Sequence, residues 1–266
     1  MSTYASKSWR AEASIQKVRE LPQGLDVLHD YSIGQFKQHS FNKFTVMNRA
    51  GQVLKFESFY SSLSETELKK ALFVFKEIFM LGREDKNTVN KAFAAVREAC
   101  WRVLGMKPYK VQVAGGVAIE SGYIADMSTG EGKTLTATLP GAWAGWRGRG
   151  WPLMTTNSYL AARDAEEMRP VYEYCGLTVS SLSDEMKPSE RKQAYLADIT
   201  YCTNKDVAAD FLRDQLTLGH GNNGVAELLN NIAGVKNNSE IILRGLECAI
   251  VDEADSVLID DGVTPL

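Results

Sequence analysis

The sequence predicts an α/β fold in which a parallel sheet is flanked by helices, and three observations support it. From about Pro108 onward, short apolar runs alternate with helical patterns, as in a parallel sheet with crossover helices. A glycine-broken turn at residues 129–134 joins one apolar run to a helical pattern, and another apolar run ends in Asp252-Glu253. Ligands on such sheets bind at the carboxyl ends of strands, where both features fall.

Composition is that of an ordinary folded chain and excludes several classes of function. The 266 residues are 44% hydrophobic and 24% charged, enough for one large α/β domain with a smaller appendage. A net charge of −3 gives no overall basic field for nucleic acid. No apolar stretch reaches the length of a membrane span, and residues 1–9 lack the apolar core of a signal peptide. Four widely spaced cysteines favour buried thiols over a zinc site.

Residues 1–60 are expected to form an N-terminal extension with helical and hairpin elements. Trp9 to Glu20 fits a short amphipathic helix, and residues 44–55 fit a β-hairpin around Gly51.

Residues 61–105 are expected to form a helical lead-in to the sheet. Ser64 and Glu67 have the spacing of a capping box that begins one helix. A second helix is expected from about Thr88 to Leu104, where Gly105 ends it.

Residues 106–266 are expected to form the nucleotide-binding domain, with a glycine- and asparagine-rich insertion at 217–244. Five strands and four crossovers are what one half of a RecA-like motor requires. The expected strands are 123–127, 152–155, 177–181, 198–201 and 248–251. The expected helices are 133–146, 158–174, 189–197 and 207–216.

The glycine-broken turn has the residue types of a phosphate-binding loop. Glycines let backbone N–H groups surround phosphate oxygens, and the following helix adds its positive end. The lysine reaches the β- and γ-phosphates, and the threonine hydroxyl ligates Mg²⁺. Met127 stands where the strict P-loop pattern has glycine, so the loop is the helicase-like variant; taken alone, it also fits a solvated loop. The expected nucleotide contacts are Thr129, Gly130, Glu131, Gly132, Lys133 and Thr134.

Asp252 and Glu253, at the end of an apolar run, complete an ATP hydrolysis site. Asp252 is expected to hold Mg²⁺, largely through water, opposite Thr134. Glu253 is expected to orient and deprotonate the attacking water, which makes Glu253 and Lys133 the candidate catalytic residues. A strand followed by a solvated acidic turn is the simpler alternative, and the phosphate-binding loop upstream argues against it.

Tyr109 and Gln112 lie just ahead of the loop and are candidates for recognising the base. A carboxamide can both donate to and accept from the adenine edge, and an aromatic ring three residues earlier can stack on it. These contacts favour ATP over GTP. The same pair also fits an ordinary helix start.

Several segments in the same order resemble the SecA family, the motor ATPases of bacterial preprotein export. Met127 is what this family has at its position. The likeness covers about residues 90–216 and 245–266. The segments that carry it are Ala92–Met106, Val111–Gly116, Ile124–Pro140, Thr156–Glu166, Ala197–Tyr201, Phe211–Asp214, Val251–Asp260 and Thr264–Leu266.

The resemblance implies a first, DEAD-like motor domain that uses ATP and Mg²⁺, with 156–163 and 200–204 as coupling segments. Its implied partners are preprotein substrates, a SecYEG-type membrane channel and the remaining domains of the same motor, with a homodimer possible and no nucleic acid. The implied location is the cytoplasm, at the inner face of the cytoplasmic membrane. Motors of this type close their site with arginines from a second domain, so the chain alone is expected to hydrolyse ATP slowly.

The coupling segments depart from the family pattern, which is consistent with a divergent or accessory member. Ser158 replaces an aspartate, Cys202 a glycine and Val263 an arginine, and residues 207–209 read Val-Ala-Ala instead of Phe-Gly-Phe. Two alternatives stay open at this point: a DEAD-box-type helicase, whose motif is spelled by residues 252–255, and a non-catalytic regulatory fragment.

Overall fold

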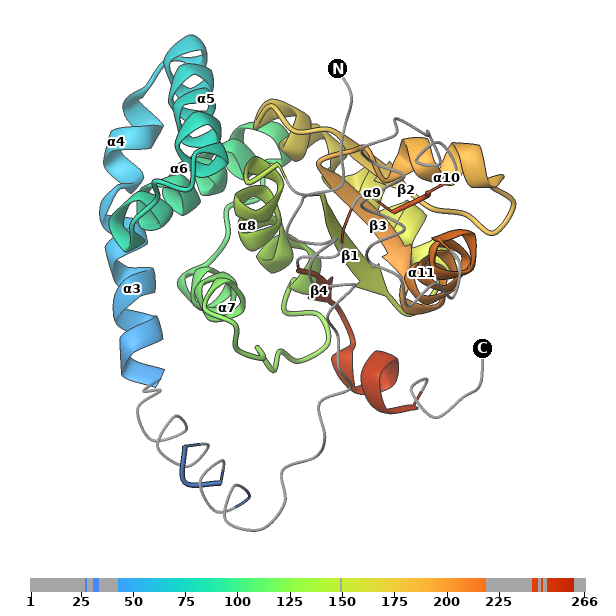
Figure 1. Ribbon diagram of the computed structural model, residues 1–266. Helices are drawn as coiled ribbons and strands as arrows, with labels where there is room; N and C mark the ends of the chain where they lie inside the picture. The colour runs from blue at the N-terminus through green and yellow to red at the C-terminus, as the bar shows by residue number, and fades with distance from the viewer. Residues whose placement is uncertain are drawn as a thin grey trace.

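The structure is a computed structural model that describes Val27, residues 31–33, 43–148, 150–218, 241–243, Gly245 and 248–260. Four parallel strands form its sheet in the order β2-β3-β1-β4 (Figure 1). Leu153 of the central strand β1 lies opposite both Tyr201 and Ile250. The strands are β1 (Trp151–Thr155), β2 (Val179–Ser181), β3 (Ile199–Thr203) and β4 (Ile250–Val251).

The strand expected at residues 123–127 is wrong, since these residues have no regular secondary structure. Ile124 is 87% exposed and Tyr123 is also exposed, so the apolar run is not buried as an inner strand of a parallel sheet would be. The other four expected strands are confirmed, with bounds that differ by a few residues.

Four helices connect or flank these strands, at the places that the sequence predicts. Residues 133–146 and 158–174 are helical with the predicted bounds, and the Asn157 side chain caps the second of these helices by accepting from Leu160 N. In Figure 1, α8 and α11 lie on opposite sides of β1 and β3. The helices are α8 (Lys133–Trp146), α9 (Ser158–Tyr174), α10 (Pro188–Ala194) and α11 (Asn204–Leu218).

The β-hairpin expected at residues 44–55 is wrong, because this segment is a helix, α3 (Lys43–Lys55). Val46, Ala50 and Val53 are buried at the spacing of one helix face, whereas the expected hairpin would place Ala50 in its turn. The α3 helix packs against α7 (Lys110–Glu120), where Arg49 forms an ion pair with Glu120 at 2.9 Å. The helix expected at Trp9 to Glu20 lies outside the described residues.

The helical lead-in agrees with the prediction, including its capping box. Ser64 N donates to the Glu67 carboxylate at 2.8 Å, and Glu67 N donates back to Ser64 Oγ. Gly105, at φ +68°, ends the second helix in the left-handed conformation. Between residues 43 and 120, the helices of the lead-in and its neighbours are α3 (Lys43–Lys55), α4 (Glu57–Ser62), α5 (Glu65–Met80), α6 (Lys86–Leu104) and α7 (Lys110–Glu120).

One apolar core joins the helical part to the sheet. Trp146 of α8 is fully buried and stacks on Phe79 of α5, with ring centroids 5.7 Å apart. Its indole N–H donates to the carbonyl of Cys175 at the end of α9. The same buried cluster extends from Val46 in α3 to Ile250 in β4, and it includes Leu135 of α8, the helix that follows the predicted phosphate-binding loop.

Candidate nucleotide-binding site

The predicted phosphate-binding loop leads directly into α8, and two glycines give it its shape. Gly130 and Gly132 have φ of +86° and +80°, in the left-handed region that glycine adopts without strain. A Cβ at Gly132 would lie 2.5 Å from Gln112 Nε2, so a side chain at this position would displace the glutamine. Glycine at 132 is therefore required by conformation and by contact.

Gln112 fastens the Tyr109 segment to this loop. Its Nε2 donates to the carbonyl of Glu131 at 2.7 Å, and its Oε1 accepts from Tyr109 N at 2.8 Å. The Gln112 side chain is buried, whereas Tyr109 is exposed. The structure thus brings the two sequence-predicted elements into direct contact, and it leaves the Tyr109 ring accessible to a ligand.

Lys133 lies at the first position of α8 and contacts the acidic pair. Its Nζ is 2.8 Å from Glu253 Oε1, and this hydrogen bond raises the pKa of Lys133. Asp252 N donates to the carbonyl of Met154 at 2.8 Å, which continues the ladder between β4 and β1. Two segments far apart in sequence therefore meet at the carboxyl end of the central strands.

Glu253 has an unusual backbone conformation. Its φ of +51° makes it the only non-glycine residue at positive φ among the residues that the structure describes. A left-handed conformation costs about 1–2 kcal/mol for a residue with a Cβ. Strained residues of this kind cluster at functional sites, where surrounding contacts hold them. Here the ion pair with Lys133 is one such contact.

Burial is the largest cause that raises the pKa of Asp252, and the neighbouring charge of Glu253 acts in the same direction. Asp164 of α9 also contributes to this rise, while Lys133 opposes it. Asp164 is itself buried and accepts a hydrogen bond from the guanidinium of Arg163. Sequence reasoning missed Asp164. Its position three residues after Ala161, on the face of α9 that is buried, was the signal that could have indicated a buried carboxylate.

The other predicted site residues lie close by without direct bonds to the acidic pair. Thr129 is exposed on the turn, and Thr134 is half-buried at the second position of α8. The Glu131 carboxylate accepts from Ser128 N at 3.3 Å, which closes the turn.

The donor set suits Mg²⁺ better than a metal held by protein alone. Within the described residues, no three His, Cys, Asp or Glu side chains gather to hold a metal ion. Mg²⁺ takes one or two carboxylates together with water and phosphate oxygens, so a half-buried Asp252 and a hydroxyl at Thr134 fit it chemically.

Comparison with known proteins identifies the family. A sequence profile described as the SecA DEAD-like domain matches residues 33–266, which is most of the chain. The chain belongs to the SecA family. The parallel sheet and its flanking helices are accordingly the RecA-like fold of a SecA DEAD-like domain, as the sequence predicted. Membership of this family does not favour the alternative of a DEAD-box-type helicase.

Curated SecA proteins are similar over most of this chain. Protein translocase subunit SecA 1 of Corynebacterium glutamicum is 43% identical over 217 residues, which are 82% of this chain and 24% of that protein. Protein translocase subunit SecA 2 of Magnetococcus marinus is 40% identical over 253 residues, 92% of this chain and 38% of that protein. SecA 2 of Chlorobium chlorochromatii is 34% identical over 254 residues, 95% of this chain and 38% of that protein. The chain thus spans about a quarter to two fifths of these relatives.

None of the helices in the part of the chain that the structure describes combines the length and the apolar character that crossing a membrane requires.

Proposed function

We propose that this chain is the first nucleotide-binding domain of a SecA-type protein translocase and that it binds ATP at the loop beside α8. The contact between Lys133 and Glu253 is the observation that carries the proposal. It brings together the two motifs that every ATP-hydrolysing motor of this class needs, and the family match supplies the context.

Each residue near the loop has a role in this proposal. Gln112 and Tyr109 contact the adenine, and residues 129–134 surround the phosphates with backbone N–H groups. Lys133 leaves Glu253 and binds the β- and γ-phosphates. That exchange frees the Glu253 carboxylate to orient and deprotonate the attacking water.

Mg²⁺, when bound, would neutralise charge on the phosphates. Thr134 and Asp252 would hold it, the aspartate largely through water. The partial burial of Asp252 suits this role, because a carboxylate that is partly shielded from solvent interacts more strongly with a cation.

In the whole protein, ATP hydrolysis would drive the export of preproteins through a SecYEG-type channel. The names of the relatives, protein translocase subunits, support this proposal. The protein would then act at the inner face of the cytoplasmic membrane, together with further domains of the same motor and with a second copy in a homodimer. Residues 156–163 and 200–204 would couple nucleotide state to the polypeptide. We infer that these 266 residues alone hydrolyse ATP slowly, since an arginine from a second domain accelerates such reactions.

A titration of the chain with a fluorescent ATP analogue and Mg²⁺ tests the proposal. Lys133→Ala should weaken binding at least about tenfold, because it removes a charged contact to the phosphates. Lys86→Ala, which removes an exposed lysine at the start of α6, is the control and should bind as the wild type does. Equal binding by wild type and Lys133→Ala would reject the site.

A further inference from the structure

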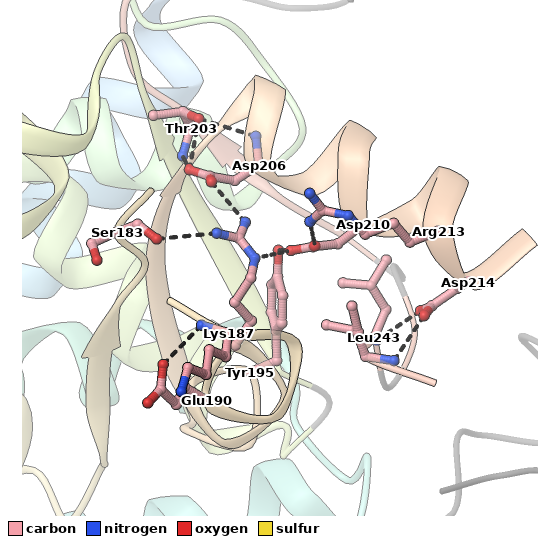
Figure 2. A network of polar contacts seen from close by, with 12 residues as sticks. Ser183, Lys187, Glu190, Tyr195, Thr203, Asp206, Asp210, Arg213, Asp214 and Leu243 are labelled. Carbon is pink, nitrogen blue, oxygen red and sulfur yellow. Dashed lines mark hydrogen bonds and ion pairs between the residues drawn. The ribbon is translucent and has the colours of Figure 1, made fainter. Parts of the chain in front are cut away.

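Three aspartates of α11 lie on one buried face of the helix. Asp206, Asp210 and Asp214 are spaced by four residues, so their side chains stack along the helix, and none is more than 6% exposed. Figure 2 shows the three carboxylates in a row, pointing toward α10 and toward the chain at Leu243. Buried carboxylates are costly unless each finds partners, so what each one binds indicates what it does.

The first two aspartates serve one ion-pair network. Arg191 of α10 donates from Nη2 to Asp206 and from Nε to Asp210, both at 2.7 Å. Asp206 also accepts from Thr203 N at the end of β3, and Tyr195 donates its hydroxyl hydrogen to Asp210. These contacts fix α11 to the end of β3 and to α10, which is an ordinary structural role.

Asp214 has a different kind of partner. Its Oδ1 accepts from Ile242 N and its Oδ2 from Leu243 N, both at 2.8 Å (Figure 2). The carboxylate therefore binds two backbone N–H groups of a segment that precedes β4 in the sequence. Ile242 and Leu243 are buried in an apolar cluster that also contains Cys202 of β3. Met154 of β1 packs against this cluster.

The contacts of α11 reach the chain on both sides of the acidic pair. Ahead of the pair, Asp214 holds residues 242 and 243; beyond it, Asn204 Nδ2 donates to the carbonyl of Val257 at 3.4 Å. Met154, packed on the cluster that contains Ile242, is also the residue whose carbonyl accepts from Asp252 N. A short path of contacts thus runs from Asp214 to the backbone of Asp252.

We propose that Asp214 is a positioning residue that fixes β4 and, through it, holds Asp252 and Glu253 at the phosphate-binding loop. The inference about the acidic pair rests on the proposed function, while the mechanical link from Asp214 to β4 does not. The two hydrogen bonds that Asp214 accepts require a carboxylate, which offers acceptors to two N–H groups at once. An asparagine would satisfy one of them and turn its NH₂ group toward the other donor.

Amide hydrogen exchange on the nucleotide-free chain tests the link without any ligand. In Asp214→Asn, the amides of residues 242–243 and 251–253 should exchange about tenfold faster, because losing a hydrogen bond to a charged group eases local opening. Asp210→Asn is the matched control, with the same substitution one turn earlier on the same buried face, and it should leave residues 251–253 unchanged. Faster exchange at 242–243 alone, or equal effects of the two variants, would overturn the proposal.

Nucleotide binding then tests the consequence for the acidic pair. Asp214→Asn should weaken binding of the ATP analogue about tenfold in the presence of Mg²⁺ and should not weaken it in EDTA, because only binding with Mg²⁺ involves Asp252. An equal loss in both conditions would mean a general defect and overturn the inference. If the wild type binds no nucleotide, the proposed function fails, and hydrogen exchange still decides the mechanical link.

A milder variant guards against a chain that does not fold. Asp214→Ser leaves space for a water molecule to bridge to Ile242 N and Leu243 N, and its effects should have the same pattern with smaller size. Wild-type exchange at residues 251–253 in this variant would also overturn the proposal.

Discussion

Lys133 has two competing partners, the carboxylate of Glu253 and the phosphates that we propose for this loop. One ammonium group cannot hold both at full strength, so nucleotide binding and the ion pair are alternatives. The pair is partly exposed, with side-chain exposures of 28% for Lys133 and 44% for Glu253. Pairs in such surroundings contribute only about 0.2–1 kcal/mol. The contact can therefore be present in this structure and still give way to phosphate.

Glu253→Gln should tighten binding of the ATP analogue by up to about fivefold, because Lys133 no longer gives up an ion pair. The difference from wild type should shrink as NaCl is raised, since salt screens exposed charges. Fluorescence titrations at two salt concentrations measure both effects. Glu185→Gln, the same substitution at an exposed residue far from the loop in sequence, should change neither. Weaker binding by Glu253→Gln would show that the carboxylate does not compete with phosphate.

At the scale of single elements, two glycines in helices have opposite conformational roles. Gly105 has φ +68° at the end of α6, and a Cβ added there would meet no other atom within 4 Å. Gly51 lies within α3 and has no positive φ. Gly105 thus serves the left-handed helix end, and Gly51 only lowers helix propensity.

The same glycine-to-alanine substitution should therefore have opposite signs at these positions. Gly105→Ala should lower the free energy of unfolding by about 1–2 kcal/mol, because alanine resists the left-handed region. Gly51→Ala should raise it by about 0.5–1 kcal/mol, and the new Cβ meets only flexible Lys110 atoms at 4.0 Å. Urea unfolding measures both. Two shifts of the same sign would contradict this assignment of helix ends and interiors.

The sequence predicted elements well where local signals agree with packing. Helices α8 and α9 combine a defined start, at Gly132 and Asn157, with a helical period. The segment that became α3 contains Phe44-Thr-Val-Met, residues that also favour strands, and its contact with α7 decides the outcome. Residues 123–127 fail for a related reason, because an apolar run forms an inner strand only where neighbours bury it.

The site shows the same division between local and tertiary signals. The loop and the acidic pair are contiguous motifs, so the sequence alone was enough to propose them as a site. Gln112 bonding to Glu131, Asp164 near Asp252, and the main-chain partners of Asp214 join segments that only the folded chain brings together. Residue type could suggest these side chains as candidates for polar contacts, but no spacing along the sequence indicates which group each one contacts.

At the scale of the whole molecule, the buried core crosses the boundary predicted between the helical lead-in and the nucleotide-binding domain. Phe79 of α5 stacks on Trp146 of α8, and both side chains are almost completely buried. Phe75 lies against the same indole, with centroids 6.2 Å apart. The boundaries at residues 60 and 105 stay predictions, but these contacts argue that the two parts unfold together.

Phe79→Ala should lower the free energy of unfolding by about 3–5 kcal/mol, the cost of removing a fully buried aromatic ring. The chain should still unfold in one transition, with circular dichroism and tryptophan fluorescence changing at the same urea concentration, because the α5 contact belongs to the common core. Phe73→Ala is the matched control on the same helix, where the ring is 60% exposed, and should shift stability by less than about 0.5 kcal/mol. Two separate transitions, with only the first moved by Phe79→Ala, would show that the helical lead-in is a domain of its own and that the phosphate-binding loop does not depend on it.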